Sequence, residues 1–337
     1  MQDECRVDPL ILESEIDFEY TMALTAPQVV ANVEVEDKYQ VGTLDNMLAA
    51  FDLYHCDNFG PNDPQYPSSN LEGYNNIDCG TLSAPKVLSI SFTCSEADFS
   101  STYLQRQCLE YLKLGMMGIT HIVNTSDHGT LTGIGIGCVD DRTGESNATT
   151  GKFSPNFPSS CPRVTTVSGT QLLPPPNTLA AADDRIVGNL TTETTFRKVS
   201  SAGQVYSSGG GLSNVFPVPS YQVSKVARYK SKEQEHLAKL EKRFSNTGRG
   251  YPDVAALANS YMVVVNGTWR TTSGTSASTL AFASIVTFIN SERLHLGKNP
   301  DGFINPALYN SPEVLNDVST SANQGCGVDE AFRATTG

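Results

Sequence analysis

Two short apolar runs with a helix between them restrict the fold of this chain more than any other feature. The runs are residues 86–92 and 119–124, and residues from about 100 to 117 between them have the apolar spacing of a helix. A strand, a helix and a second strand in this order form a βαβ unit, which predicts a parallel sheet with helices on both faces. We therefore expect an α/β fold, with further strands at residues 163–168 and 261–265.

The charge of the chain argues against two classes of partner. Its 337 residues carry a formal net charge of −13. Nucleic acids and anionic membranes both select basic surfaces, so we expect neither nucleic acid nor membrane as a partner. The sequence has no run of about 18 apolar residues that could span a bilayer, and its first residues lack the apolar core of a signal peptide.

The cysteines and glycosylation motifs indicate an oxidising compartment. Eight cysteines are spread along the chain without a Cys-x-x-Cys pair, so a structural zinc site is not expected. Cys56 and Cys79 bracket a loop rich in Pro, Asn and Gly and form a candidate local disulfide, whereas the pairing of the others stays open. Four Asn-x-Ser/Thr motifs are compatible with the secretory route; they begin at Asn124, Asn147, Asn189 and Asn266.

A stretch of small residues, Thr272-Ser-Gly-Thr-Ser-Ala-Ser278, precedes a long apolar run at residues 279–286. If that run is a buried helix, Ser276 lies at its N-terminus, where free main-chain N–H groups and the helix dipole favour negative charge. A serine nucleophile needs this setting, because the oxyanion formed on attack must meet fixed donors. The alternative is that the stretch only caps the helix.

Glu13 and Asp17 lie four residues apart on the helix predicted for residues 10–24, so their carboxyl groups are neighbours on one face. Two like charges at this distance raise the pKa of one group. Such a pair can serve as general base and supporting acid at low pH. Glu15 and Glu19 have the same spacing, and a pair of solvated surface acids is the alternative interpretation.

The sequence Ser126-Asp127-His128-Gly129 directly follows the second predicted strand. Active sites of parallel sheets form beyond the carboxyl ends of the strands, so Asp127 is well placed to be a catalytic acid or a ligand. A turn or a helix cap is the alternative role for this aspartate. The glycine run at 209–211 lacks the Lys-Ser/Thr ending of a phosphate-binding loop and predicts a tight turn.

Several motifs in a fixed order carry a resemblance to a known family. They are Glu13-x-x-x-Asp17, Ser126-Asp-x-Gly129, Phe157-Pro-Ser-Ser-Cys-Pro162, Ser208-Gly-Gly-Gly-Leu-Ser213, Arg249-Gly-Tyr-Pro-Asp-Val-Ala255, Ser273-Gly-Thr-Ser-Ala-Ser278, Gly302-Phe-Ile-Asn-Pro-Ala-Leu-Tyr309 and Asn316-Asp-Val318. The pattern covers nearly everything from Glu13 onwards. It resembles the sedolisin family of serine-carboxyl peptidases, which includes the tripeptidyl peptidases, and especially the fungal-type members.

The resemblance implies a subtilisin-like α/β fold in which a glutamate replaces the usual histidine. It implies that Ser276 is the nucleophile, that Glu13 is its general base and that Asp17 orients Glu13. Asp127 would help to form the oxyanion hole, for which it must be protonated, and this favours activity at acidic pH. The implied substrates are peptides and proteins. Release of tripeptides from N-termini is the expected reaction, although the sequence leaves internal cleavage open.

The chain departs from the family pattern beside two of these residues. The family has Ser-Gly-Asp at the oxyanion aspartate and Gly-Gly-Thr-Ser at the nucleophile. Here Ser126 and Ser273 stand at the glycine positions, so side chains occupy places where bare backbone is expected. The motif that begins at Asn124 lies at the end of a predicted buried strand, and we expect this asparagine to stay unmodified.

The two ends of the chain depart further from the family pattern. Family members begin with a signal peptide and a large pro-segment, whereas this chain begins about a dozen residues before the predicted Glu13 helix. We therefore expect residues 1–337 to be a single catalytic domain that lacks its N-terminal part, its pro-segment and its extreme C-terminus. The resemblance implies that the intact precursor is a secreted glycoprotein and a zymogen, with the pro-segment as its partner.

The resemblance also implies one structural Ca²⁺ ion. Its ligands would be the side chain of Asp317 and the carbonyl of Val318, together with carbonyls that match Thr335 and Gly337. A final aspartate of this site would lie beyond residue 337. Because calcium takes six or more oxygen ligands, we expect an incomplete site that binds poorly.

Two other functions stay open. A subtilisin-type Ser-His-Asp peptidase would use the sequence His128-Gly-Thr130, but the glycine-rich sequence after His128 does not predict a helix. No Asp-Thr-Gly or Asp-Ser-Gly motif precedes this histidine either. The second alternative is a truncated homologue that keeps the site residues but is inactive.

Overall fold

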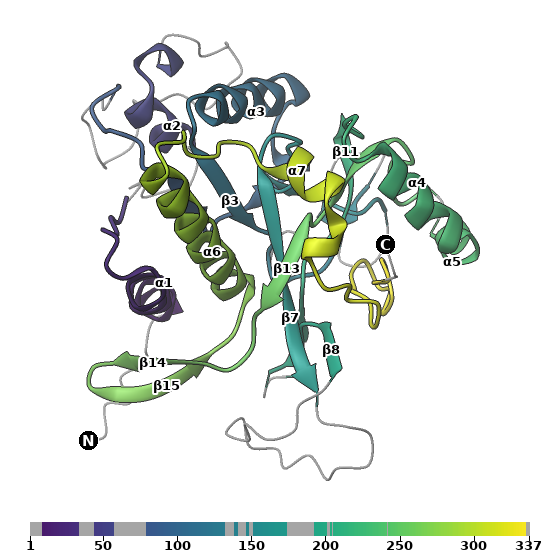
Figure 1. The fold of residues 1–337 in the computed structure, drawn as a ribbon. Helices are drawn as coiled ribbons and strands as arrows, with labels where there is room; N and C mark the ends of the chain where they lie inside the picture. Colours follow the sequence, from purple (N-terminus) through teal and green to yellow (C-terminus); the bar gives the residue numbers. More distant parts are fainter. Residues whose placement is uncertain are drawn as a thin grey trace, which may run out of the picture.

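A parallel sheet lies at the centre of the fold (Figure 1). The computed structural model describes residues 9–33, 44–56, 79–131, 138–140, 146–147, 151–173, 192–200, 203, 205–240 and 242–334. Within these residues, four parallel strands lie side by side in the order β1 (Val87–Ile90), β3 (Thr120–Asn124), β7 (Thr165–Leu173) and β13 (Val254–Leu257). A fifth strand, β8 (Thr192–Thr195), pairs antiparallel with β7. The predicted α/β fold is confirmed.

Helices cover both faces of this sheet. Successive side chains of a strand point to opposite faces, and successive residues of β3 are buried on both. Val123 belongs to the apolar core shared with α3 (Ser101–Met116), and its neighbour Ile122 belongs to the core shared with α6 (Thr275–His295). The helix α3 connects β1 to β3, which completes the predicted βαβ unit. Its N-terminus is capped by Ser100, whose hydroxyl accepts a hydrogen bond from the main-chain N–H of Tyr103.

The helix α1 (Pro9–Thr25) packs against α6 and not against the sheet itself (Figure 1). Ile16, which is 2 % exposed, lies in one apolar cluster with Ala277 and Leu280 of α6. Tyr20 reaches the neighbouring strand β14 (Tyr261–Val265), where its hydroxyl is hydrogen-bonded to both main-chain groups of Met262. These contacts set which face of α1 is turned towards the start of α6.

Residues 261–265 form a strand, as predicted, but this strand lies outside the central sheet. They form β14, which pairs with β15 (Thr268–Thr272) in a separate antiparallel hairpin. The turn is Asn266-Gly267, and both residues have positive φ, 50° and 70°. An Asn-Gly pair of this conformation closes a two-residue hairpin. The fourth parallel strand of the sheet is β13, which the apolar pattern of the sequence did not predict.

The remaining elements are short and surround the sheet. The helices are α2 (Asp45–Phe51), α4 (Val223–Lys232), α5 (Gln234–Lys239) and α7 (Asn305–Asn310), with single turns η1 (Leu53–His55), η2 (Glu96–Asp98) and η3 (Pro312–Val314). The strands are β2 (Cys94–Ser95), β4 (Cys138–Val139), β5 (Ser146–Asn147), β6 (Asn156–Phe157), β9 (Arg197–Val199), β10 (Val205–Ser207), β11 (Gly211–Pro217) and β12 (Gly248–Tyr251). Across the described ranges, no helix combines the length and the apolar character needed to cross a membrane.

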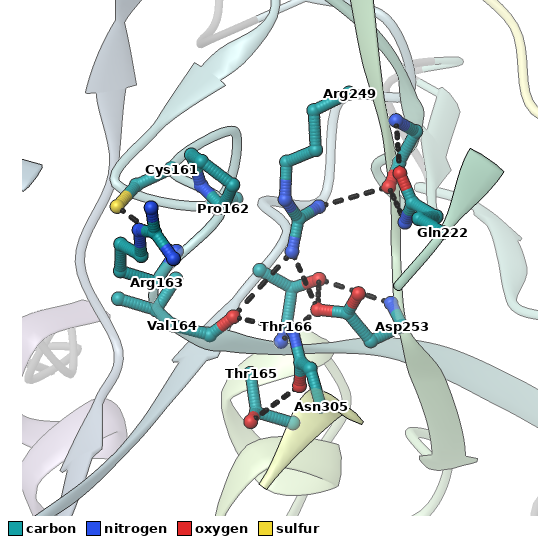
Figure 2. Close-up of polar contacts among 12 residues, drawn as sticks. Cys161, Pro162, Arg163, Val164, Thr165, Thr166, Gln222, Arg249, Asp253 and Asn305 are labelled. Atoms are coloured by element: carbon teal, nitrogen blue, oxygen red, sulfur yellow. Dashed lines mark hydrogen bonds and ion pairs between the residues drawn. The ribbon is translucent and has the colours of Figure 1, made fainter. Parts of the chain in front are cut away.

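A buried ion pair holds the segment between β12 and β13 against the start of β7 (Figure 2). The guanidinium of Arg249 lies 2.6 Å from Oδ2 of Asp253, and both side chains are fully buried. The same carboxylate oxygen accepts hydrogen bonds of 2.8 Å from the main-chain N–H and the hydroxyl of Thr166. Breaking such a pair leaves an uncompensated buried charge, which costs about 3–5 kcal/mol. The motif Arg249-Gly-Tyr-Pro-Asp253 therefore has a structural role in joining these strands.

Three disulfides are present in the described part of the chain. Cys56 and Cys79 are joined, as predicted. The other two link Cys108 of α3 to Cys161 and Cys138 of β4 to Cys326 near the C-terminus. Cys94 forms no disulfide with a described cysteine, and Cys5 lies outside the described residues.

Candidate active site

The loop after β3 meets the start of α6 at the carboxyl end of the sheet. β3 ends at Asn124, and the main-chain N–H of Thr275, the first residue of α6, donates a 2.7 Å hydrogen bond to Oδ1 of Asp127. Ser276 follows in the first turn and is 7 % exposed. The N-terminus of a helix presents free N–H groups, so this junction is suited to bind a developing negative charge.

Gly274 makes the close approach between these two segments possible. A Cβ atom at this position would lie 2.7 Å from Oδ2 of Asp127, closer than real Cβ contacts. Its φ of 163° is extended backbone, so the lack of a side chain matters here for space and not for conformation. Ser273, which replaces a glycine of the family pattern, is accommodated because its hydroxyl accepts from the N–H of Ser260 and donates to Oδ1 of Asn259.

The second departure from the family pattern, Ser126, is less well accommodated. Its φ is +68°, in the left-handed region that favours glycine. The residue is buried, so the serine side chain is held in this conformation next to Asp127. The local chain geometry is therefore the one expected for glycine, with a serine in its place.

Glu13 and Asp17 lie on the face of α1 that is turned towards α6. The hydroxyl of Ser276 and the charge of Asp127 both act on the pKa of the Glu13 carboxyl group, which places these three side chains together, and Oε1 of Glu13 is buried without a hydrogen-bond partner among the described residues. The charge of Glu13 and the hydroxyl of Ser91, the residue that follows β1, act in turn on the pKa of Asp17. All four residues predicted to be catalytic are thus in one cluster, although they come from α1, the β3 loop and α6.

Burial raises the pKa values of the three carboxyl groups in this cluster. The pKa of Glu13 is raised by burial, against the Ser276 hydroxyl, which lowers it. The pKa of Asp17 is raised to about 7 by burial and by the charge of Glu13. The pKa of Asp127 is also raised by burial, although hydrogen bonds from Thr275 oppose this. Protonated carboxyl groups therefore persist in this cluster to a higher pH than in solvent.

His128 lies beside Asp127 but is directed elsewhere. Its ring lies 5.7 Å from the ring of Tyr206, and Ser276 acts on the pKa of Glu13 but is not among the groups that act on the pKa of His128. Burial lowers its pKa, and the charge of Asp127 only partly opposes this. The structure therefore does not bring His128 into the position of a base for Ser276.

A cavity of about 490 Å³ opens behind the two carboxyl groups of α1. It extends between α1, β1 and α6, with Glu13, Asp17 and Ser91 among its lining residues. Ser91 was not identified from the sequence, although its position directly after a parallel strand was the available signal.

The predicted calcium ligands are only partly described. Asp317 is exposed and Val318 is half-buried, whereas Thr335 and Gly337 lie outside the described residues. The two described positions offer one carboxylate and one carbonyl, fewer oxygens than calcium takes. No three His, Cys, Asp or Glu side chains gather as a metal site in the part of the chain that the structure describes. The described residues alone therefore do not fit a calcium ion.

Two of the glycosylation motifs lie in clearly different environments. Asn124 is 7 % exposed at the end of β3, whereas Asn266 is exposed in the hairpin turn. The side chain of Asn147 and the whole of Asn189 lie outside the described residues.

Comparison with known proteins shows relatives over nearly the whole chain. No family model matches it. The chain is 40 % identical over 338 residues to tripeptidyl-peptidase SED1 of Arthroderma otae. This alignment covers 96 % of this chain and 49 % of the relative. It is 35 % identical to aorsin of Aspergillus oryzae over 349 residues, 94 % of this chain and 49 % of the relative. The chain thus spans about half the length of these curated relatives.

More distant comparisons agree with this similarity. Tripeptidyl-peptidase 1 of Rattus norvegicus is 38 % identical over 248 residues, which are 72 % of this chain and 38 % of the relative. Among solved structures, Pseudomonas sedolisin, a serine-carboxyl proteinase in complex with two molecules of pseudo-iodotyrostatin, matches with a TM-score of 0.53 at 22 % identity. This match covers 75 % of this chain and 60 % of that one, and it supports the fold.

Proposed function

The chain belongs to the sedolisin family of serine-carboxyl peptidases, and on this premise we propose that it hydrolyses peptide bonds at acidic pH and releases tripeptides from N-termini. The observation that carries the proposal is the junction of Asp127 with the first turn of α6, where the Ser276 hydroxyl acts on the buried carboxyl group of Glu13. The names of the relatives support the tripeptidyl specificity. Because the chain spans about half of those relatives, the activity of the whole protein is part of the proposal.

In the proposed reaction, Ser276 Oγ attacks the carbonyl carbon of the scissile peptide bond. Its proton passes to the carboxylate of Glu13, and the carbonyl oxygen becomes the oxyanion of a tetrahedral intermediate. The intermediate collapses when the C–N bond breaks and Glu13 returns the proton to the leaving amine. Water then attacks the acyl-enzyme, again with Glu13 as base, and Ser276 regains its proton.

Asp127 would stabilise the oxyanion as a protonated acid. Its Oδ1 already accepts from the N–H of Thr275, so a proton on Oδ2 is free to be donated to the oxyanion. Burial raises the pKa of Asp127, which favours the protonated form at acidic pH. Asp17 would orient Glu13, its neighbour one helical turn away. This division of roles accounts for an acid optimum.

We further propose that the natural precursor is secreted, glycosylated and made as a zymogen whose pro-segment is a partner of this domain. The substrates are peptides and proteins, and neither nucleic acids nor membranes are proposed as partners. A structural calcium ion held in part by Asp317 and Val318 belongs to the same proposal. The described donors alone do not fit calcium, so no step of the reaction depends on it.

The function is tested with a tripeptide linked through its C-terminal carbonyl to a fluorogenic amine, with either a free or an acetylated N-terminus. We expect hydrolysis of the free form near pH 4 and a loss of at least about 10³-fold in kcat for Ser276→Ala. Ser278→Ala is the matched control, because this buried serine lies two residues later in α6 and donates to the carbonyl of Leu257. Cleavage of both forms would replace the tripeptidyl assignment with endopeptidase action.

Two results would contradict the proposal. If the parent shows, at any pH, no hydrolysis that Ser276→Ala abolishes, the chain is an inactive homologue. A neutral optimum that disappears in His128→Ala would instead support a Ser-His-Asp peptidase.

A further inference from the structure

The main chain that leads to Asp127 is held at every residue by segments outside its own strand. Four consecutive carbonyl groups each accept one hydrogen bond. The bonds run from Ser159 Oγ to Asn124 O (2.6 Å), from Asn156 Nδ2 to Thr125 O (2.8 Å), from the N–H of Gly209 to Ser126 O (2.9 Å) and from the N–H of Ser207 to Asp127 O (2.8 Å). The direction of the Asp127 side chain is thus set by partners distant in sequence.

This loop needs such support because Ser126 has a φ of +68°. A serine in the left-handed region is unfavourable and persists only where surrounding contacts maintain it. The peptide group between Thr125 and Ser126 is the one whose rotation would release this conformation. The hydrogen bond to the Thr125 carbonyl restrains that peptide group directly.

Asn156 provides this restraint from a fixed position. It is fully buried, and its own main-chain N–H donates to the hydroxyl of Tyr251 at 3.0 Å. Tyr251 is buried and is located in the sequence between Arg249 and Asp253. The ion pair of these two residues anchors this segment to β7 (Figure 2). Asn156 therefore connects a rigid part of the core to the loop that carries Asp127.

We propose that Asn156 is a positioning residue for Asp127: its side-chain amide holds the Thr125 carbonyl and thereby keeps the Asp127 carboxyl group at the start of α6. The proposal rests on the proposed function, in which Asp127 stabilises the oxyanion. Without the amide, the Thr125 carbonyl is a buried acceptor that has lost its side-chain donor. The loop then relaxes, and Asp127 moves away from the N–H of Thr275.

The chain offers a matched control in Asn305. This asparagine is also fully buried, and its Nδ2 also donates to a main-chain carbonyl, that of Val164, at 2.9 Å. Figure 2 shows it beside the start of β7. Val164 precedes β7, whereas Thr125 follows the end of β3, so the two asparagines make the same bond at opposite ends of the parallel strands.

The first readout does not depend on activity. Hydrogen exchange of the Thr275 amide is measured by NMR relative to the amide of Val123 in β3. In Asn156→Ala we expect this ratio to rise at least about 10-fold, because the Thr275 N–H loses its carboxyl acceptor. In Asn305→Ala the ratio should stay within about 2-fold of the parent, even if its melting temperature falls by as much as that of Asn156→Ala.

The second readout is kinetic. Asn156→Ala should lower kcat about 10²-fold, as for loss of an oxyanion donor, with KM within about 3-fold of the parent. Asn156→Asp adds a pH signature, because its carboxyl group can donate to the Thr125 carbonyl only while protonated. We expect this variant to be near the parent in kcat at acidic pH and to lose activity at a lower pH than the parent does. Asn305→Asp should keep the parental profile.

The outcomes separate this proposal from the proposed function. An unchanged Thr275 exchange ratio in Asn156→Ala, or an equal change in Asn305→Ala, would overturn the positioning role. If the parent has no Ser276-dependent hydrolysis, the proposed function fails, and the exchange ratio still decides the role of Asn156. If Asn156→Ala does not fold, the exchange ratio of Asn156→Asp at acidic and neutral pH decides it, and a ratio independent of pH would contradict the proposal.

Discussion

Gly274 and Asp127 lie so close together that a Cβ on the glycine would stand 2.7 Å from Oδ2 of the aspartate. The next residue, Thr275, donates its N–H to Oδ1 of the same carboxyl group at 2.7 Å. The carboxyl group of Asp127 is therefore confined by the turn that precedes Ser276. A change in this turn should therefore displace the Asp127 carboxyl group even where it leaves the overall fold intact.

Gly274→Ala should displace the Asp127 carboxyl group and weaken its bond to Thr275. We expect kcat to fall about 10²–10³-fold, the range for loss of an oxyanion donor, while the protein stays folded. Gly115→Ala in α3 is the control, since its Cβ would meet Phe303 at an ordinary 3.5 Å. Kinetics and circular dichroism of both variants test this, and a parental kcat in Gly274→Ala would exclude the confinement of Asp127 as a catalytic requirement.

The pH–rate profile should separate the three carboxyl groups. Glu13→Gln cannot accept the Ser276 proton and should be nearly inactive at every pH. Asp127→Asn keeps a donor that cannot ionise, so residual activity should extend to higher pH than in the parent. The rising limb then belongs to the coupled Glu13 and Asp17 pair, and the falling limb reports loss of the Asp127 proton.

His128→Ala is the control for this profile of kcat/KM against pH. The histidine makes no described hydrogen bond to Ser276, so the variant should keep the parental shape. If Glu13→Gln keeps a near-parental kcat/KM and His128→Ala is inactive, the protein is instead a histidine-based serine peptidase.

The stability of the protein should fall between about pH 4 and pH 7 through Asp17. Its pKa is raised from an ordinary 3.8 to about 7 in the folded protein by burial and by the charge of Glu13. Between these values the folded state binds the proton and the unfolded state does not, so the free energy of unfolding decreases as the pH rises. Asp17→Asn cannot ionise, and urea unfolding should show it equal to the parent, or less stable, at pH 3.5 and relatively more stable at pH 7.5.

Asp45 provides a control of opposite sign for this measurement. Burial acts to raise its pKa, but hydrogen bonds from His55 and Gln107 outweigh burial and lower it. Asp45→Asn should therefore lose stability near neutral pH and approach the parent as the pH falls. The same direction of change for both variants would contradict the assignment of these pKa shifts.

Ser126→Gly should stabilise the protein, because Ser126 has a φ of +68°. Relief of the left-handed conformation exceeds the extra entropy of glycine in the unfolded chain, and we expect a gain of about 0.5–1 kcal/mol. The change removes the glycosylation motif at Asn124, so the comparison is made on unglycosylated protein. Ser284→Gly within α6 is the control and should lose about 0.5 kcal/mol through helix propensity; a loss of similar size in Ser126→Gly would refute the strain.

Local sequence patterns were sufficient for the main elements of the fold. The apolar runs and the helix between them predicted β1, α3 and β3, because strand and helix periods depend on residues a few positions apart. The motif order led to the family and to Glu13, Asp17, Asp127 and Ser276 as candidates. The strand at 261–265 was predicted, but its place in a separate hairpin was not, since a run of apolar residues does not specify its pairing partner.

The face of α1 that carries the site was not determined by spacing. Glu15 and Glu19 repeat the spacing of Glu13 and Asp17. Packing of Ile16 against α6 turns Glu13 and Asp17 towards Ser276, whereas Oε1 of Glu19 accepts from the N–H of Val264. Which face of α1 is turned inwards depends on the helix against which α1 packs. The residues of α1 by themselves do not specify that this helix is α6.

The site itself depends on contacts between distant segments. Asp127 and Thr275 are 148 residues apart in the chain, and Asn156 reaches the Thr125 carbonyl from another loop. The motifs named these segments as candidates, and the closeness of Gly274 to Asp127 and the positive φ of Ser126 became visible only in three dimensions. The physical reason is that burial, which raises the pKa values of these acids, is produced by packing across the whole domain and not by neighbours in sequence.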